Sequence, residues 1–432
     1  MINREDLFKK WGEVLDHPDL PKIKDPYRKT VTAILLENQE VASRQGNTDG
    51  MLTEDIQNAA SGGVTYSGNP NLKGYDPVLI AMIRRLAPNL VAFDLCGVQP
   101  MNAPIGLIFA LKSRYTAQSG NEALFKEADT AFGGTGVHSL PLNPLDPALS
   151  TGRGNTLAFG EQLGVTGHPA FPEMAFSIDR ISVTAKTRAL KAEFTVELQQ
   201  DLKAIHGLDA ESELANILST EINAEINREV IRTIYICAVP GAQNNVTAPG
   251  IFDLDVDSNG RWLVEKFKGL MYQVERECNE IAKQTRRGKG NLVLCSSDVA
   301  SALSMAGLLD YGDHLKDNLN VDDTGNTFVG TLNGRLKVYI DPYVATSDTN
   351  FFVAGFRGKN AYDAGIFYCP YVPLQLVKAL DPNSFQPKIG FKTRYGLVAN
   401  PFSNANLDSN GDGSLSANNN IYYRKVQIDN LM

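Results

Sequence analysis

Apolar residues recur every three to four positions between Asp209 and Cys237, which predicts one long amphipathic helix. The residues expected on its inner face are Leu214, Leu218, Ile222, Ile226, Val230 and Ile234, joined by Ile217 and Ile231. Charged pairs at i,i+3 spacing are expected on the opposite, hydrated face: Glu225 with Arg228, and Glu229 with Arg232. At the rise of an α-helix the segment is roughly 43 Å long, so it can form the spine of a domain.

Other stretches also have helical periodicity. Residues 262–287 predict a second long helix that ends in a cationic turn before Gly288. Its expected inner face is Phe267, Leu270, Val274, Cys278 and Ile281. Residues 77–86 predict a helix opened by Pro77, and two short helices before residue 54 form a predicted hairpin around the connection 18–26. The apolar positions of that hairpin are Leu7, Phe8, Trp11, Leu15, Val31, Ile34 and Leu35.

Several shorter apolar runs predict β-strands. They are residues 91–98, 105–115, 291–295, 336–340, 351–356, 364–372, 390–399 and 421–428. Because these strands mix with long helices and no internal repeat is visible, the predicted fold class is α+β.

Two segments have no regular pattern. Residues 55–74 are small and polar, which is typical of an extended arm. Residues 116–172 are rich in Gly, Pro, Thr, Ser and Asn. Loops of that length are uncommon inside compact domains and are usually functional or bound to a partner. We therefore expect residues 116–172 to be an excursion, with a two-stranded hairpin at most, that a neighbouring molecule orders.

Composition limits the classes of function. The chain has 432 residues, 43% of them hydrophobic and 21% charged, with a net charge of −8. A sizeable core is therefore expected, and a chain-wide basic field for nucleic acid is excluded. The five cysteines contain no Cys-x-x-Cys, so a disulfide framework or zinc site is not expected and a reducing compartment fits better. No signal peptide and no membrane span are predicted.

Motifs of catalysis are scarce. We find no Gly-x-Ser-x-Gly, no His-Glu-x-x-His and no Walker loop. The fragments Gly134-Thr135-Gly136 and Gly152-Arg153-Gly154 lack the strand–turn–helix context of a dinucleotide site. The five histidines are scattered and none pairs with another at ligand spacing. No catalytic or cofactor-binding residue is predicted, so the protein is not expected to be an enzyme.

One acidic motif has metal-binding chemistry. Asp408, Asn410 and Asp412 are followed by Gly413 and Ser414, the opening of a calcium loop, although position twelve is Asn419 and cannot give a bidentate carboxylate. The candidate calcium ligands are therefore Asp408, Asn410, Asp412 and Ser414. A weaker copy begins at Asp255 and Asp257. Asn, Asp and Gly are also ordinary turn residues, so a turn without metal stays open at both places.

Several collinear segments, spread over most of the chain, resemble the major capsid protein of T-even-type tailed phages. They are Ala87-Pro88-Asn89-Leu90-Val91-Ala92-Phe93-Asp94-Leu95-Cys96-Gly97-Val98-Gln99-Pro100-Met101, Arg188-Ala189-Leu190-Lys191-Ala192, Gln200-Asp201-Leu202-Lys203-Ala204-Ile205-His206-Gly207, Glu221-Ile222, Glu225-Ile226-Asn227-Arg228-Glu229-Val230, Asp363-Ala364-Gly365-Ile366 and Gly390-Phe391-Lys392-Thr393-Arg394-Tyr395-Gly396.

The resemblance implies the Hong Kong 97-type capsid fold, with an N-terminal arm, an extended loop, a peripheral domain that carries the spine helix, and an axial domain. The implied divisions are 1–54, an N-terminal segment that interacts with the scaffold and is removed; 55–75, the arm; 76–102, the start of the peripheral domain; 103–185, the extended loop with a shortened insertion; 186–239, the peripheral domain with the spine; 240–362, the axial domain; and 363–432, the closing strands.

The resemblance also implies a function. The chain would assemble into hexameric capsomers of an icosahedral or prolate, DNA-filled head. A prohead protease would remove the N-terminal segment by cutting between Glu54 and Asp55, with Leu52 as the recognition residue.

Partners and location follow from the same resemblance. The expected partners are other copies of the chain, scaffold and protease, with vertex, portal and decoration proteins and with DNA enclosed without sequence-specific binding. The expected location is the virion capsid, assembled in the host cytoplasm, with no membrane contact.

Two alternatives stay open: an encapsulin-like compartment shell, and a calcium-dependent enzyme or adhesion module motivated by Asp408 to Asp412.

Overall fold

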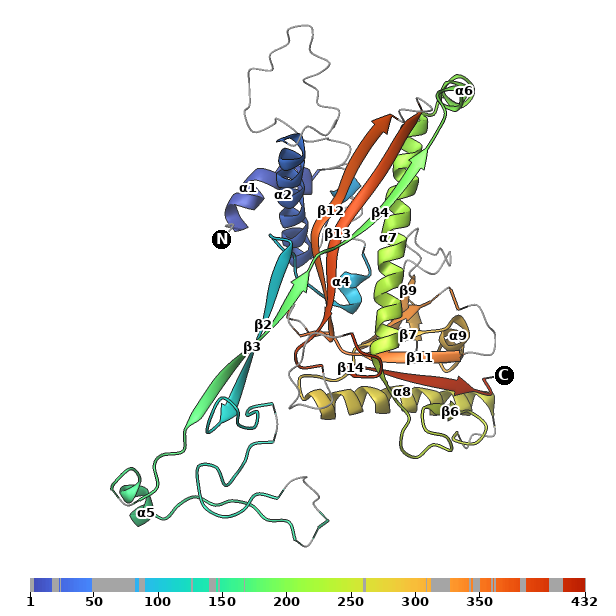
Figure 1. The fold of residues 1–432 in the computed structure, drawn as a ribbon. Coiled ribbons are helices and arrows are strands. Elements are labelled where there is room, and N and C mark those ends of the chain that lie inside the picture. The colour runs from blue at the N-terminus through green and yellow to red at the C-terminus, as the bar shows by residue number, and fades with distance from the viewer. Residues whose placement is uncertain are drawn as a thin grey trace.

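The structure is a computed structural model of the chain. It describes residues 4–17, 23, 25–48, 82–84, 90–125, 127–139, 145–146, 148–166, 168–258, 262–307, 309–311, 327–341, 343–344, 350–358, 360, 363–380, 386–403 and 415–431. Helices and two large sheets form an elongated α+β body from which one hairpin projects (Figure 1). The fold class predicted from the sequence is therefore confirmed.

The N-terminal helical hairpin is confirmed. It consists of α1 (Arg4–Leu15) and α2 (Pro26–Thr48), and Leu7, Trp11 and Leu15 are buried as their spacing predicted. Of the helix predicted over residues 77–86, the structure describes residues 82–84, which are helical.

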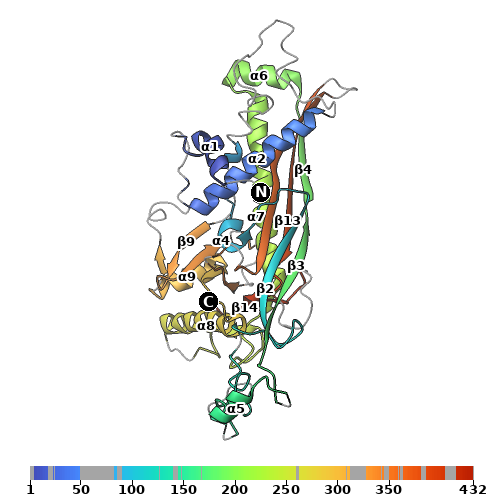
Figure 2. The same cartoon turned by 90° about the vertical axis from the view of Figure 1, so that its left-hand side faces the viewer.

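A four-stranded sheet forms the upper body in the order β1-β12-β13-β4. Its strands are β1 (Gly97–Val98), β12 (Ile366–Leu380), β13 (Pro387–Ala399) and β4 (Lys186–Glu193). The long helix α7 (Ala210–Cys237) packs along β4 and β13, and α2 packs against β12. Figure 2 shows both helices on the same side of this sheet. The short helix α6 (Val196–His206) precedes α7 at the upper end of the molecule.

A second sheet with eight strands forms the lower body. Its order is β5-β14-β11-β7-β10-β9-β8, and β6 also pairs with β14. The bounds are β5 (Ala238–Pro240), β6 (Ile251–Asp253), β7 (Leu292–Cys295), β8 (Leu309–Tyr311), β9 (Thr327–Leu332), β10 (Leu336–Ile340), β11 (Asn350–Gly355) and β14 (Asn420–Asp429). Helices α8 (Leu263–Thr285) and α9 (Ser297–Met305) pack against it.

Both long helices were predicted to within about two residues at each end. The predicted inner face of α8 is buried throughout, and α7 buries Ile222, Ile226, Val230 and Ile234. One predicted core residue of α7 is wrong, because the Ile217 side chain is 61% exposed in the first half of the helix. The left-handed residue that ends α8 is Arg286, two positions before the expected glycine stop.

The strand predicted over residues 91–98 is wrong. Residues 92–95 form the short helix α4 (Ala92–Leu95), and only β1 at its end is extended. Ala92, Phe93 and Leu95 are all buried. A short continuous apolar run is compatible with either a buried strand or a buried helix, so periodicity could not separate the two.

A separate two-stranded hairpin leaves the body between the two sheets. It pairs β2 (Ile105–Tyr115), as predicted, with β3 (Met174–Thr184) in antiparallel register. The chain beyond these strands contains α5 (Leu157–Gln162) and lies away from the body in both views (Figures 1 and 2). No helix among the described residues is long and apolar enough to cross a membrane.

Candidate functional site

The β2–β3 hairpin is attached to the body by one face near its base. Ile108, Ile181 and Val183 pack in a small core with residues of β12 and β13. Gly396 of β13 allows this close crossing, because a Cβ there would lie 2.5 Å from Val183 Cγ1. Farther along β2, Lys112 on the same face pairs with Asp179 at 2.6 Å and lies 5.0 Å from the ring centroid of Phe402 in the body. The hairpin therefore has a defined seat on the four-stranded sheet.

The opposite face of the hairpin is exposed and carries a row of large apolar side chains, with Arg180, Ser182 and Thr184 of β3 beside them. Successive side chains of a strand alternate between faces, and the register places the alternate residues of β2 beside those of β3. Its large apolar side chains are between 47% and 63% exposed: Ile105, Leu107, Phe109, Leu111, Met174, Phe176 and Ile178. We call this set the apolar hairpin face. Contiguous exposed apolar surface of this kind marks an interaction site in soluble proteins.

The segment beyond the hairpin has little core of its own. Helix α5 has no buried residue, and Leu145 and Leu157 are strongly exposed. Beyond Phe125, its recorded contacts are local, such as the isolated bridge between Thr135 and Arg153. The described part of residues 116–172 is thus irregular apart from α5, as predicted. The two-stranded hairpin expected within this segment is not found among its described residues; the hairpin is formed instead by β2 and β3, which flank the segment.

The root of the projecting segment is fixed by one cation between two rings. The Arg287 guanidinium lies 4.1 Å from the centroid of Phe125 and 3.9 Å from that of Phe402. It also pairs with Asp363 at 3.3 Å. Phe125 follows β2, while Arg287 follows α8, so this contact joins the base of the projection to the lower body.

Helix α7 is tied to the upper sheet through Arg188 of β4. This guanidinium donates to Glu225 at 2.5 Å and to Glu229, one turn farther along α7, and also to the hydroxyl of Tyr395 at 2.9 Å. Burial, together with the bond that Tyr395 donates to Glu229, raises the pKa of Tyr395. Glu225 and Glu229 thus bind β4, instead of the i,i+3 partners expected from the sequence.

The same helix is tied to the lower sheet through Asp341. Arg228 donates to both carboxylate oxygens of Asp341 at 2.7 Å, and the Tyr235 hydroxyl donates to one of them at 3.0 Å. The Asp341 side chain is fully buried. Helix α7 is therefore the mechanical link between the two sheets, held at both by charged hydrogen bonds.

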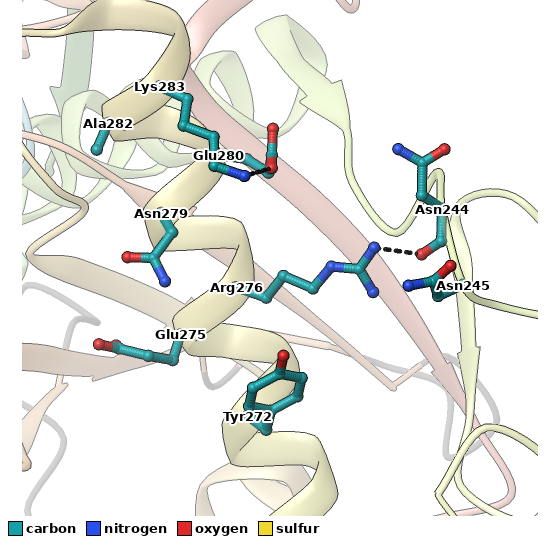
Figure 3. A pocket seen from close by; sticks show the side chains of 9 residues that line it. All are labelled: Asn244, Asn245, Tyr272, Glu275, Arg276, Asn279, Glu280, Ala282 and Lys283. Carbon is teal, nitrogen blue, oxygen red and sulfur yellow. Dashed lines mark hydrogen bonds and ion pairs between the residues drawn. The ribbon is translucent and has the colours of Figure 1, made fainter. Parts of the chain in front are cut away.

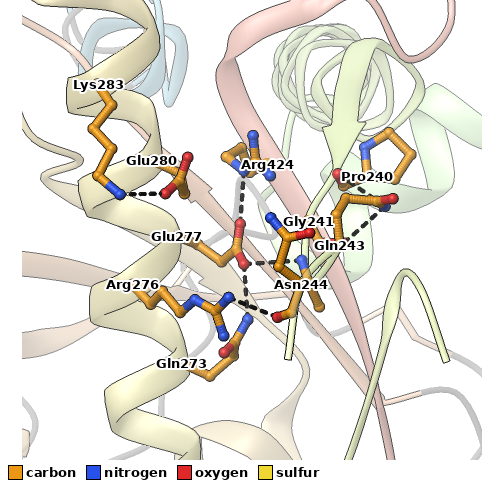
Figure 4. Close-up of polar contacts among 11 residues, drawn as sticks. Pro240, Gly241, Gln243, Asn244, Gln273, Arg276, Glu277, Glu280, Lys283 and Arg424 are labelled. Carbon is orange, nitrogen blue, oxygen red and sulfur yellow. Dashed lines mark hydrogen bonds and ion pairs between the residues drawn. The ribbon is translucent and has the colours of Figure 1, made fainter. Parts of the chain in front are cut away.

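A buried carboxylate connects α8 with the strands beneath it (Figure 4). Glu277 accepts hydrogen bonds from Gln273 at 2.8 Å and from the backbone N–H of Ala242 at 2.9 Å, and it pairs with Arg424 of β14 at 2.6 Å. Both charged side chains are almost fully buried. Each polar atom of the carboxylate therefore has a partner, as a buried charge requires.

An open hollow of about 670 Å³ lies on the outer face of α8 (Figure 3). Its charged side chains bind neighbours: Arg276 donates to the backbone oxygen of Asn244 at 2.6 Å, and Lys283 pairs with Glu280. The lining residues combine no nucleophile with a general base, so the hollow is an ion-paired surface.

Other reactive groups of the described chain are in the core. All five cysteines are buried free thiols, and desolvation raises the pKa of Cys295 to about 12 and that of Cys237 to about 11. Within the described ranges, no three His, Cys, Asp or Glu side chains form a group that could hold a metal ion.

The predicted site residues lie mostly outside the described residues. This applies to the cleavage residues Leu52, Glu54 and Asp55, and to the calcium candidates Asp408, Asn410, Asp412 and Ser414. In the weaker calcium motif, Asp257 accepts hydrogen bonds from the backbone N–H groups of Thr247 and Asp253, and Asp255 pairs with Lys266. Asp257 there closes a turn, as its residue type alone would allow.

Comparison with known proteins decides between the interpretations that the sequence left open. A family model described as major capsid protein Gp23 matches residues 72–428. The chain belongs to the Gp23 major capsid protein family. It is 38% identical to the major capsid protein of Serratia phage KSP90, over 99% of this chain and 98% of that protein. It is 33% identical to the major capsid protein of Enterobacteria phage T4, over 98% of each.

Membership of the Gp23 family establishes the biological role. The protein is a structural component of the virion and forms the capsid shell of a tailed phage, and it is not an enzyme. A more distant relation, 28% identity over 53% of this chain, joins it to the capsid vertex protein of phage T4. A solved structure from Mycobacterium phage Bobi aligns over 79% of this chain and 90% of its own, with 10% identity and a TM-score of 0.40. The resemblance to T-even-type capsid proteins is thus confirmed by sequence.

Proposed function

We propose that this Gp23-family protein assembles into hexameric capsomers in which the apolar hairpin face of one copy is buried on the next. The single observation that carries this proposal is the row of large, half-exposed apolar side chains on a hairpin that stands away from its own body. The capsomers then tile an icosahedral or prolate head that encloses DNA.

The apolar hairpin face supplies a driving force of suitable size. Full burial of such a side chain is worth roughly 1.5–3 kcal/mol, and these side chains are already about half covered. Their complete burial then contributes roughly 5–10 kcal/mol per subunit before the entropy lost on association. In a ring each copy both gives and receives such a contact, so the contributions repeat around the capsomer.

This proposal is tested by substituting Phe109 and Phe176 on the apolar hairpin face with Ser. We expect the folded variant to remain a single subunit under conditions in which the parent forms capsomers, as measured by sedimentation and negative-stain microscopy. The control is Tyr272→Ser on α8, an aromatic side chain that is 71% exposed but lies elsewhere. Normal capsomers from the double variant would contradict the proposal.

We also propose that maturation removes residues 1–54 by cleavage between Glu54 and Asp55, with Leu52 as the recognition residue. The Leu-x-Glu pattern occurs again at residues 35–37 and 263–265, but those lie in α2 and α8. Proteolysis favours exposed, irregular backbone over packed helices. Mass spectrometry of finished particles is expected to find Asp55 as the first residue, and Glu54→Gln particles are expected to keep the segment. An intact N-terminus in DNA-filled particles would contradict this.

The partners of the assembling shell follow from its family. We propose scaffold and prohead protease during assembly, and vertex, portal and decoration proteins on the finished head. The net charge of −8 favours enclosing DNA without tight binding. The arrangement would be of the Hong Kong 97 type, with 55–75 as arm, 103–185 as extended loop and 240–362 as axial domain.

Calcium binding by Asp408, Asn410, Asp412 and Ser414 stays a separate prediction. If the loop binds calcium, adding the ion raises the melting temperature of the parent protein, and Asp412→Ala abolishes the rise. An unchanged melting temperature of the parent with and without calcium contradicts the site.

A further inference from the structure

The N-terminal helical hairpin is packed into the body although it is the segment that maturation is proposed to remove. Residues 31–40 of helix α2 are buried or half-buried, and the helix packs against α1 and against β12. Its buried apolar residues belong to the main core of the molecule, together with Leu90 and Phe93 of the body. They are Val31, Ala33, Leu35 and Leu36. This stretch of α2 is therefore part of the core, not a loosely attached tail.

The polar groups of this hairpin are matched to backbone acceptors of the body. The Asn38 amide donates both hydrogens, one to the carbonyl of Met101 at 2.7 Å and one to that of Tyr371 at 3.0 Å. The Tyr27 hydroxyl donates to the carbonyl of Val98. These bonds span the end of β1 and the adjoining part of β12, so they fix the position of α2 along the sheet.

Charged groups complete the contact from both sides. Arg28 of α2 pairs with Asp94 of α4 at 2.6 Å, and its guanidinium lies 5.4 Å from the ring centroid of Phe93. In the other direction, Arg84 of the body donates to the backbone oxygen of Leu15 at the end of α1, at 2.8 Å. The surface beneath the hairpin therefore offers carbonyl acceptors to Asn38 and Tyr27, and a carboxylate and an aromatic ring to Arg28.

We infer that cutting the chain ahead of the body leaves the α1–α2 hairpin bound as a separate polypeptide, so that cleavage and departure of the segment are two separable steps. The inference rests on the proposed function, since cleavage at Glu54 is part of that proposal. The surface formed by α4, β1 and β12 thus binds the α1–α2 hairpin of the same chain. Before the cut the hairpin is covalently attached, and after the cut it stays bound as a non-covalent ligand.

The cut removes the tether of the hairpin but none of its contacts with the body. A flexible tether raises the effective concentration of a ligand, to the order of millimolar when it is short and less when it is long, and cutting it removes only that contribution. The contacts made by Asn38, Arg28 and the buried apolar residues remain unchanged. In a closed shell the fragments stay near many equivalent surfaces, so rebinding continues until the hairpin unfolds or is degraded.

The test uses the full chain with the site of a sequence-specific endoprotease replacing residues 50–55. After native cutting, size-exclusion chromatography with intact-mass detection is expected to find the N-terminal fragment in the same peak as the body at micromolar concentration. Hydrogen exchange is expected to find the amides of α2 as protected as in the uncut chain. Immediate separation of the fragment from a body that remains folded would overturn the inference.

Substitutions test whether the contacts described above hold the cut fragment on the body. Asn38→Ala and Arg28→Ala are each expected to release the cut fragment roughly tenfold faster than the parent. The matched control is Lys9→Ala on the exposed side of α1, expected within about twofold of the parent. Release at the parent rate from both Asn38→Ala and Arg28→Ala would overturn the assignment. Circular dichroism of each uncut variant separates faster release from failure to fold.

The engineered site keeps this inference separate from the maturation proposal. If natural particles prove to contain residues 1–54, the cleavage proposal fails while the engineered cut still measures retention. If natural particles lack the segment but the engineered fragment separates at once, retention fails while the cleavage proposal stands.

Discussion

Helix α8 and the β2–β3 hairpin each carry a continuous row of large apolar side chains, but the two rows meet different surroundings. On α8 the row from Phe267 to Ile281 is at most 4% exposed, because the lower sheet and α9 cover it. On the hairpin the row that includes Phe109 and Phe176 is about half exposed or more. Similar apolar patterns thus differ in their surroundings: one stabilises the subunit, and the other is exposed in the single subunit and is, on our proposal, covered by a neighbouring copy.

The largest effect on folding is expected in the body, at the buried ion pair. Glu277→Ala leaves Arg424 as an unpaired buried charge, which is expected to lower the free energy of unfolding by about 3–5 kcal/mol. Denaturant titration of the unassembled subunit measures this change. The control is Glu280→Ala on the outer side of the same helix, expected to change the value by less than about 0.5 kcal/mol. Equal effects of the two substitutions would contradict the buried network.

A smaller but still large effect is expected from the core face of α7. Ile226→Ala removes a buried side chain and is expected to cost about 2–5 kcal/mol. Ile217→Ala, on the same helix but at an exposed position, is expected to cost less than about 1 kcal/mol. Thermal or denaturant unfolding compares them directly. Similar losses for both would mean that the end of α7 is covered in solution.

The smallest effect on folding is expected on the apolar hairpin face. Leu111→Ser replaces an exposed side chain, so the free energy of unfolding of the unassembled subunit is expected to change by less than about 0.5 kcal/mol. The same variant is expected to weaken capsomer formation, which sedimentation measures. A loss of several kcal/mol in the unassembled subunit would place Leu111 in a core and remove the contrast with α8.

The elements predicted well are those whose period is unambiguous. Helices α7 and α8 repeat apolar positions every three to four residues over several turns, a period that strands do not have. Strand β10 was also predicted well, because a turn at Asn333–Gly334 marks where it begins. Residues 91–98 failed because a short apolar run carries no period. The i,i+3 pairs expected on α7 failed because Arg188 and Asp341, distant in sequence, offered the same charges better partners.

The apolar hairpin face was predicted only in part. Strand β2 was recognised, but its run of apolar residues does not tell which face is buried, and β3 was missed. A usable signal lies in β3: Met174, Phe176 and Ile178 are apolar at even positions, whereas Ile181 and Val183 are apolar at odd ones. This change of phase coincides with the change from exposed to buried apolar side chains. It indicates a strand whose two ends direct their apolar side chains to opposite faces of the hairpin.

The stacking of Arg287 between Phe125 and Phe402 has a geometric consequence for the assembled shell. It connects the base of the projecting segment to the residue that follows α8, near the body and away from the outer end of the segment. A rotation of a few degrees at that joint sweeps the tip through a much wider arc. In the assembly proposed above, the direction in which the arm meets a neighbouring subunit therefore depends on this contact together with the seat of the hairpin on the four-stranded sheet.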